Sequence, residues 1–330
     1  MKMKILIHFW IPREVAEQVN EEFELIYPEE KENGLMCLDK VKEILPDVEG
    51  ILVSGLALGK PVDKKMIDMG TKLKVIGTLG VGYENVDFKY AGEKGIGVIN
   101  TPVSVQQPTA ELTISIMMAV ARCVVSLDKK VRTEKRSIRL PLFDKQATNL
   151  HGKNLGIIGF GRIGKAVGVK CHGLGMNIMY SDPVPADKNF EESISATRVS
   201  LEELLKTADF VTVHCPYLPE NHHLINAKTL AMIKPTAYLI NASRGKMVDE
   251  EALVAVLKAE KIAGAALDVY EFEPEINQDL LKLDNVVLVP HIGTWSYHTR
   301  VAMALESLQG MCSFMKGEIP ENCANEAYIK

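Results

Sequence analysis

The stretch Leu155-Gly-Ile-Ile-Gly159-Phe-Gly161-Arg-Ile-Gly164-Lys165 determines the fold that we expect for this chain. A short apolar run, typical of a buried parallel strand, passes directly into a Gly-x-Gly-x-x-Gly pattern. Gly159 permits a tight turn, Gly161 lets backbone approach a pyrophosphate, and Gly164 lets the following helix pack against the strand. The stretch therefore predicts a strand, a phosphate-binding turn and a helix whose N-terminal N–H groups face the phosphates.

A second apolar run, Asn177 to Tyr180, is followed by Asp182, 18 residues after Gly164. A carboxylate at this distance is placed to accept hydrogen bonds from a ribose 2′-hydroxyl, whereas a 2′-phosphate would be repelled. The pattern therefore predicts NAD rather than NADP. A glycine-rich structural turn is the alternative, and the ordered series of strand, glycines, helix, second strand and acid argues against it.

Length and composition bound the class of protein. At 330 residues the chain exceeds the usual size of a single core, so two domains are expected. The net charge of −5 gives no reason to expect nucleic acid or an acidic membrane as a partner. No apolar run has the length of a membrane span, and the N-terminus has no signal-peptide pattern, so we expect a cytoplasmic protein. The six scattered cysteines form no Cys-x-x-Cys pair, which predicts free thiols and no metal site.

Short apolar runs alternate with helical patterns through the first part of the chain. This alternation predicts an α/β fold, in which a parallel sheet is covered by helices. No glycine pattern follows Phe9, so this part has no obvious dinucleotide site. The expected strands are 5–9, 25–27, 50–53, 75–78 and 98–99, and the expected helices are 13–20, 38–45, 63–69 and 88–93.

The middle of the chain holds a predicted helix and a long arm. Pro108 and Thr109 suit a helix start, and the apolar helix is expected to run from residue 110 to about residue 125. The stretch from Lys129 to Leu150 reads as a loop, and loops of this length are uncommon inside compact domains. We therefore expect an arm, apolar at Ile138 to Phe143, that contacts another subunit; a solvated loop is the alternative.

Polar residues follow the strands predicted in the second half, at 210–213, 238–240, 263–267 and 286–289. Ligands of open parallel sheets collect at the carboxyl ends of strands, so these residues are site candidates. A last helix, from about residue 299 to 314, is expected to return to the N-terminal half. The blocks at the strand ends are His214-Cys-Pro216, Asn241-Ala-Ser-Arg-Gly245, Asp268 and Pro290-His291.

Hydride transfer to a carbonyl also requires a proton donor, and histidine is the usual one. His291 is the best candidate, because it follows a buried strand and a proline and precedes Gly293. A carboxylate would orient it, and Asp268, Glu271 and Glu273 are all available. Arg244, at another strand end, offers a planar fork that can bind a substrate carboxylate. A structural histidine and a solvated arginine are the alternatives.

At this point the chain resembles the D-isomer-specific 2-hydroxyacid dehydrogenases, which include glyoxylate and hydroxypyruvate reductases, D-lactate dehydrogenase and phosphoglycerate dehydrogenase. The resemblance covers nearly the whole chain, because six blocks occur in the family's order. They are Thr78-Leu-Gly-Val-Gly-Tyr-Glu-Asn-Val-Asp87, the glycine pattern, His214 to Pro216, Asn241 to Gly245, Asp268 to Pro274, and Pro290-His-Ile-Gly293.

The resemblance implies two doubly wound parallel-sheet domains. A Rossmann NAD-binding domain, residues 101–294, would be inserted into a flavodoxin-like substrate-binding domain, residues 1–100 and 295–330. It also implies a cleft that closes on the substrate, and a homodimer formed through the NAD-binding domains and the arm.

The resemblance also assigns roles to residues. Arg244 would bind the 2-oxo-carboxylate, His291 would be the acid/base, and Glu273, directly before a proline, would be its partner. The N–H groups around Val81 and Gly82 would hold the substrate carboxylate. The family positions that contact NAD correspond to Thr109, Gly159, Gly161, Arg162, Ile163, Gly164, Asp182, Pro216, Asn221, Ala242, Asp268 and Gly293.

The expected activity is reversible, NAD-dependent reduction of a 2-oxoacid to its D-2-hydroxyacid. The loop Ser54 to Leu58 has no arginine, which argues against a phosphorylated substrate. Together with Phe9, Leu56 and Leu58, Trp295 could form an apolar pocket, which favours an apolar or aromatic side group. The substrate expected overall is a 2-oxoacid with an apolar or small side group. A phosphite-oxidising NAD enzyme is one alternative. The other, from a different class, is an NAD-sensing binding protein like the transcriptional corepressors that resemble this family.

Overall fold

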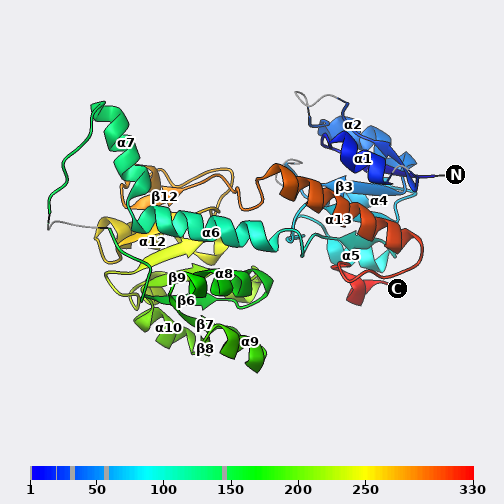
Figure 1. Cartoon of the computed structure of the whole chain (residues 1–330). Helices are drawn as coiled ribbons and strands as arrows, with labels where there is room; N and C mark the ends of the chain where they lie inside the picture. The colour runs from blue at the N-terminus through cyan, green and yellow to red at the C-terminus, as the bar shows by residue number, and fades with distance from the viewer. Residues whose placement is uncertain (1, 20, 30–33, 56–58, 143–146) are drawn as a thin grey trace. The chain divides into compact units, whose positions relative to one another are not determined.

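The computed structural model describes residues 2–19, 21–29, 34–55, 59–142 and 147–330 (Figure 1). It divides into two compact units, one made of Met1–Val105 with Thr294–Lys330 and the other of Gln106–Gly293. The first unit therefore contains both ends of the chain. Its bounds differ by a few residues from the predicted domains, and the assignment of the first unit to substrate binding remains a prediction.

The first unit is built on a five-stranded parallel sheet in the order β2-β1-β3-β4-β5. This order is the flavodoxin-like, doubly wound one. Among the described residues, three helices cover one face of the sheet, and two others, from opposite ends of the chain, cover the other face. The strands are β1 (Met3–Ile7), β2 (Phe23–Ile26), β3 (Gly50–Val53), β4 (Val75–Thr78) and β5 (Gly97–Ile99). The first face carries α2 (Leu38–Ile44), α4 (Lys64–Met69) and α5 (Phe88–Glu93), and the second α1 (Arg13–Val19) and α13 (Tyr297–Met315).

The C-terminal helix α13 packs on this sheet, as the sequence predicted (Figure 1). Glycines permit its close approach, because a Cβ at Gly77 would lie 2.6 Å from the Ser307 hydroxyl and one at Gly97 would lie 2.6 Å from the Phe314 ring. The helix begins at the Ser296 cap, whose side chain accepts the N–H of Thr299.

The second unit contains a seven-stranded parallel sheet in the order β12-β11-β10-β9-β6-β7-β8. The chain starts at the central β6, moves outward to β8, and then crosses to β9 and onward, which is the Rossmann pattern. The strands are β6 (Asn154–Ile158), β7 (Asn177–Ser181), β8 (Thr197–Arg198), β9 (Phe210–Val213), β10 (Tyr238–Asn241), β11 (Gly264–Leu267) and β12 (Val286–Leu288).

Helices cover both faces of this sheet, and its central strands β6, β9, β10 and β11 are buried between them. One face is covered by α6 (Gln106–Ala121), α8 (Arg162–Gly173) and α9 (Lys188–Ser193), and the other by α10 (Leu201–Thr207), α11 (Ala227–Leu230) and α12 (Glu250–Lys258). The two sheets and their helices confirm the predicted fold class of two doubly wound α/β domains. The 3-10 turns are η1 (Leu45–Asp47), η2 (Pro219–Asn221), η3 (Gly245–Met247), η4 (Leu280–Lys282) and η5 (Glu326–Tyr328).

The region between the two halves differs from the prediction. Helix α6 begins at Gln106, so Pro108 lies inside its first turn rather than before it. A proline is tolerated there because the first four N–H groups of a helix have no intrahelical partner. The chain then turns at Cys123, with φ of 54°, into a further helix, α7 (Val124–Glu134). The stretch expected to be a loop from Lys129 is therefore helical at its start.

The rest of the predicted arm is irregular where it is described. Leu140 is 55% and Leu142 80% exposed, while Phe143 lies outside the described residues. In the described part of the chain no single helix has the length and apolarity to cross a membrane; α6 and α7, bent by 58°, meet those criteria only as a pair.

Candidate active site

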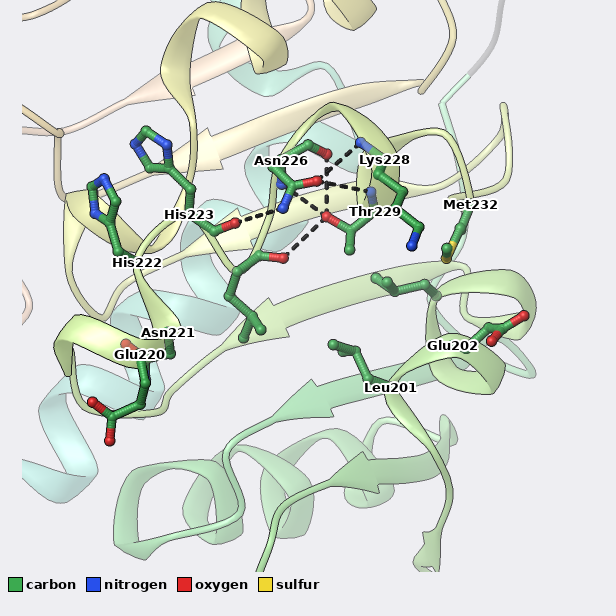
Figure 2. Close-up of a pocket in the computed structure, with 12 residues that line it drawn as sticks. Leu201, Glu202, Glu220, Asn221, His222, His223, Asn226, Lys228, Thr229 and Met232 are labelled. Atoms are coloured by element: carbon green, nitrogen blue, oxygen red, sulfur yellow. Dashed lines mark hydrogen bonds between the residues drawn. The ribbon is translucent and has the colours of Figure 1, made fainter.

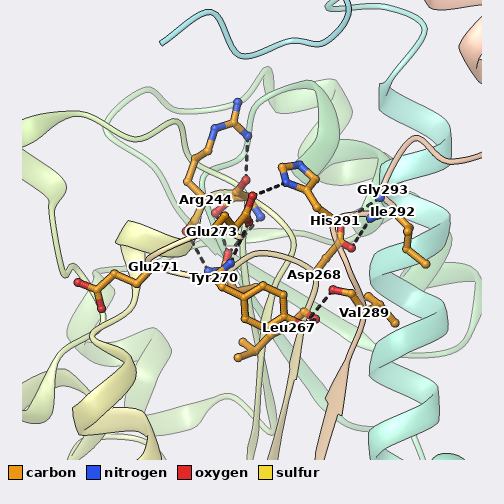
Figure 3. Close-up of polar contacts among 12 residues, drawn as sticks. Arg244, Leu267, Asp268, Tyr270, Glu271, Glu273, Val289, His291, Ile292 and Gly293 are labelled. Carbon is orange, nitrogen blue, oxygen red and sulfur yellow. Dashed lines mark hydrogen bonds and ion pairs between the residues drawn. The ribbon is translucent and has the colours of Figure 1, made fainter. Parts of the chain in front are cut away.

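Three neighbouring strands bring the candidate catalytic residues to one edge of the second sheet. Arg244, Asp268 and His291 follow β10, β11 and β12, which are adjacent and parallel. The carboxyl ends of parallel strands meet at the same edge, so the three side chains gather there (Figure 3).

His291 is paired with Glu273. Its Nδ1 lies 3.0 Å from Glu273 Oε2, and Glu273 Oε1 accepts the N–H of Tyr270 at 3.0 Å. Burial works to raise the pKa of Glu273, but the hydrogen bond and charge of His291, the Tyr270 N–H and the charge of Arg244 outweigh it and lower the pKa. Glu273 is therefore a carboxylate at neutral pH, able to orient the His291 ring.

Asp268 shapes the backbone that carries His291. Its carboxylate accepts the N–H groups of Ile292 at 2.6 Å and Gly293 at 2.9 Å, just after His291. His291 itself has φ of 55°, a left-handed conformation that non-glycine residues adopt with strain. Burial raises the pKa of Asp268 to about 6, although the bond from Ile292 and the charge of His291 oppose the shift. The two bonds hold the loop in the conformation that presents the imidazole.

The third acid near His291 has a different partner. Glu271 Oε1 lies 2.7 Å from His223 Nε2, and Figure 3 shows Glu271 pointing away from Glu273 and His291. Of the three acids that the residues alone left open, Glu273 is thus the one in contact with the His291 ring.

Arg244 is positioned by its neighbours in the turn after β10. Its carbonyl oxygen accepts the side-chain amide of Asn241 at 2.9 Å, and its Nη1 donates to the Ser243 carbonyl at 2.8 Å. The next residue, Gly245, has to be a glycine, because a Cβ there would collide with the carbonyl of Tyr270. The turn carrying Arg244 therefore lies directly against the loop carrying Glu273.

The glycine-rich turn has the shape that a dinucleotide requires. Gly159 has φ of 88°, and a Cβ there would collide with the backbone of Cys215. A Cβ at Gly164 would collide with the Gly159 carbonyl, so helix and strand are in close contact. By contrast, nothing lies within 4 Å of a Cβ built at Gly161, and helix α8 starts there without a side-chain cap. Its open first turn, with Arg162 and Ile163, therefore fits a pyrophosphate.

Asp182 closes the same turn from the end of β7. One carboxylate oxygen accepts the N–H of Phe160 at 2.7 Å, within the glycine-rich turn, and the other accepts the N–H of Val184 at 2.8 Å. A carboxylate has about four acceptor positions. These two bonds therefore fix Asp182 while leaving it able to accept hydrogen bonds from a ribose.

The other residues predicted to contact NAD lie in the same unit. The Asn221 side chain accepts the N–H of Leu218 at 2.7 Å and donates to the Pro216 carbonyl at 2.8 Å, so it shapes the loop after β9. Thr109 is buried in α6, and its hydroxyl would lie 3.5 Å from a Cβ at Gly293. Ala242 is buried directly after β10.

The residues predicted to bind substrate belong to the first unit. The carbonyl of Val81 accepts the Asn100 amide at 2.8 Å, which holds the Val81-Gly82 turn after β4. Trp295 is 74% exposed before α13. Leu56 lies outside the described residues.

Two further histidines lie at strand ends, His214 within a block named from the sequence and His8 at a position given no role there. His8 is buried after β1, and its Nε2 accepts the N–H of Ser54 at 2.9 Å. Both ring nitrogens of His214, after β9, are shielded from solvent and lack a partner in the described chain. Burial lowers the pKa of each to about 4. The strand-end position that marked His214 could also have marked His8.

Comparison with known proteins identifies the family to which this fold and site belong. Residues 114–293 match the model of the D-isomer specific 2-hydroxyacid dehydrogenase, NAD binding domain. A Staphylococcus aureus (strain MRSA252) protein, named as a 2-hydroxyacid dehydrogenase, is 41% identical over 322 residues, covering 98% of this chain and 99% of its own.

Two solved structures extend the match. Rhodotorula graminis D-mandelate dehydrogenase is 28% identical, with a TM-score of 0.84 and 96% of both chains covered. The NADPH-dependent glyoxylate/hydroxypyruvate reductase of Sinorhizobium meliloti is 30% identical, with a TM-score of 0.82 and all of both chains covered. The chain belongs to the D-isomer-specific 2-hydroxyacid dehydrogenase family, whose members are oxidoreductases acting on CH–OH groups with NAD(P).

Proposed function

We propose that the protein is an NAD-dependent D-2-hydroxyacid dehydrogenase that interconverts a 2-oxoacid and its D-2-hydroxyacid. The observation that carries this proposal is the 3.0 Å contact between His291 and Glu273 at the sheet edge where Arg244 also lies. A histidine oriented by a carboxylate can exchange a proton with a hydroxyl group, and an arginine fork can bind a carboxylate.

Each residue has a defined role in this proposal. Arg244 binds the substrate carboxylate and polarises the neighbouring carbonyl. The protonated His291 ring donates a proton to the carbonyl oxygen during reduction and takes it back during oxidation, while Glu273 stabilises the protonated ring. The nicotinamide cofactor, when bound, supplies or accepts the hydride. The N–H groups of the Val81-Gly82 turn also bind the substrate carboxylate in this proposal.

The proposed substrate has an apolar or small side group. The exposed Trp295 and the absence of arginine from Ser54 to Leu58 support this choice. The names of the two structural relatives, a mandelate dehydrogenase and a glyoxylate/hydroxypyruvate reductase, cover the same range of side groups.

The proposed cofactor is NAD rather than NADP. Asp182, fixed by the N–H groups of Phe160 and Val184, supports this because a fixed carboxylate repels a 2′-phosphate. The relative named as NADPH-dependent shows that the cofactor has to be tested for each protein.

A substrate panel tests the function. Glyoxylate, hydroxypyruvate, pyruvate, and branched and aromatic 2-oxoacids are each mixed with the protein and either NADH or NADPH, and cofactor absorbance is followed. We expect oxidation of NADH with at least one oxoacid. If no oxoacid is turned over while phosphite reduces NAD, the protein is a phosphite dehydrogenase; if NADH binds but nothing is turned over, it is a binding protein.

We also propose a cytoplasmic homodimer formed through the second unit. The apolar side chains of Val124 and Val125 on α7, and of Leu140 and Leu142 in the arm, are exposed in the single chain and support a subunit contact. All six cysteines are free thiols, as expected in a reducing compartment. Light scattering of the protein as it elutes from a size-exclusion column measures its molar mass in solution. A monomer mass would contradict the proposal.

A further inference from the structure

A second cluster of ionisable side chains lies outside the proposed catalytic site. His222, His223 and Glu271 each offer one ligand atom, and these atoms lie within 4.8 Å of one another. In the part of the chain that the structure describes, no other group of three such residues has this arrangement. Figure 2 shows the two histidines side by side after η2, and Glu271 comes from the segment after β11.

Glu271 is held in place by a buried neighbour. Its Oε2 accepts the N–H of Glu250 at 3.3 Å, and its own N–H donates to Glu250 Oε1 at 2.7 Å. These bonds leave Oε1 directed at His223 Nε2, 2.7 Å away. The Glu271 side chain is only 10% exposed, so its negative charge is little screened by water. A cation would find there a fixed carboxylate and an imidazole already in contact.

The backbone of His223 is fixed as well. Its φ is 51°, its N–H donates to the Lys246 carbonyl at 3.0 Å, and its carbonyl accepts the Asn226 amide at 2.8 Å. The loop therefore fixes where the His223 side chain is attached, and the contact with Glu271 orients its ring.

His222 completes the cluster from the surface. Its ring stacks on His223, with centroids 3.8 Å apart and planes 23° apart, and its other aromatic contact is the edge of Tyr217. Two nearly parallel rings cannot point their nitrogen lone pairs at one ion. Because His222 is exposed, rotation about its side-chain bonds can turn the ring nitrogen toward Glu271 at little cost.

We propose that His222, His223 and Glu271 form a binding site for a divalent transition-metal ion of the zinc class. Two imidazole nitrogens and one carboxylate oxygen are a donor set that zinc accepts while keeping a position open for water. Both histidines line a surface pocket of about 460 Å³, and His222 is exposed, so an ion can reach the His222 ring from solvent. This site is separate from the proposed oxoacid chemistry.

The ion would connect two segments that are distant in sequence. One is the loop after β9 that contains Asn221, and the other is the segment after β11 that contains Glu273. A ligand that binds only the folded state stabilises it, so zinc is expected to raise the unfolding temperature.

Titration with Co²⁺, a spectroscopic substitute for Zn²⁺, tests the site in the untagged, metal-free full-length chain. We expect one equivalent to bind, with visible ligand-field bands but without the near-ultraviolet band of a cobalt–thiolate bond. The second feature distinguishes this site from the exposed Cys37. No saturable binding, or a thiolate band at one equivalent, would overturn the proposal.

Matched histidine variants locate the ion. His222→Ala should weaken binding at least about tenfold and abolish the zinc-dependent rise in unfolding temperature, because one of three ligands is lost. His172→Ala removes an exposed histidine from α8 and should change neither result. Glu271→Gln should weaken binding as His222→Ala does. If His222→Ala binds the ion as tightly as the unmodified protein, the assignment is wrong.

Discussion

His291 has a backbone conformation that few non-glycine residues adopt. Two acids stabilise different parts of this residue. Asp268 bonds the N–H groups that follow His291, while Glu273 contacts the ring itself. Asp268 therefore fixes the backbone that carries the ring, and Glu273 fixes the orientation of the ring.

These different contacts predict different effects when each acid is replaced by its amide. Glu273→Gln keeps the side-chain volume but removes the charge that stabilises a protonated ring, so kcat should fall at least about a hundredfold with little change in unfolding temperature. Asp268→Asn should lower both kcat and the unfolding temperature, because it replaces an oxygen that accepts the N–H of Ile292 or Gly293. Equal kcat for Glu273→Gln and the unmodified enzyme would contradict the assignment.

Asp182 gives a prediction about cofactor choice. Asp182→Asn keeps one oxygen acceptor for Phe160 or Val184 but removes the charge that repels a 2′-phosphate. The ratio of kcat/KM for NADPH to that for NADH should therefore rise at least about tenfold, since relieving one charge repulsion contributes more than about 1.4 kcal/mol. The ratio is measured with the best oxoacid at saturation. An unchanged ratio would show that the cofactor's ribose does not bind beside Asp182.

At this scale the sequence predicted residue types better than contacts. Strand ends identified Arg244, Asp268 and His291 as neighbours, because parallel strands bring their carboxyl ends together. The choice among three nearby acids depended on how the loop after β11 turns, which spacing alone does not determine. The family resemblance had to supply Glu273, and the roles of these residues remain predictions.

At the scale of the elements, two glycines of the glycine-rich turn have different roles, one in cofactor binding and one in stability. A side chain at Gly161 would meet open space, whereas one at Gly164 would meet the Gly159 carbonyl. Gly161→Val should therefore leave the unfolding temperature nearly unchanged but raise the Kd for NADH, because it fills the approach to the pyrophosphate.

Gly164→Ala is the matched variant in the same turn. It should destabilise the protein by about 1–3 kcal/mol, because the added methyl group forces helix and strand apart. Denaturant unfolding and NADH fluorescence titration of both variants measure the contrast. A strongly destabilised Gly161→Val, or a Gly164→Ala as stable as the original, would contradict this view of the turn.

The elements that the sequence predicted well were those with a regular burial pattern. Strands β3, β4 and β9 have the predicted bounds because each is a short apolar run between turn residues. Helix α7 was missed because it has no buried residue within the single chain, so its basic, polar sequence resembled a loop.

At the scale of the whole molecule, two buried histidines make stability depend on pH. Burial lowers the pKa of His8 and His214 from 6.5 to about 4, so folding favours their neutral forms. Their contribution to stability is therefore complete above pH 6.5 and is lost as the pH falls toward 4. Asp268, whose pKa is raised to about 6, acts in the opposite direction between about pH 4 and 6.

A variant isolates one histidine from these opposing effects. His214→Leu should lose the acid sensitivity of this position, so its stability relative to the original protein should rise by up to about 3 kcal/mol between pH 7 and pH 4. Denaturant unfolding of both proteins at each pH gives the difference, in which the effect of Asp268 cancels. A difference independent of pH would show that His214 is not held neutral by the fold.

The central claim is that His291 exchanges the proton while a 2-oxoacid is reduced to the D-hydroxyacid. The most direct measurement follows NADH consumption with the best oxoacid of the panel, for the original enzyme and His291→Ala, and determines the chirality of the product. We predict one D-2-hydroxyacid formed for each NADH consumed, and a kcat for His291→Ala lower by at least about a hundredfold. An L-hydroxyacid product, or a His291→Ala enzyme as fast as the original, would contradict the claim.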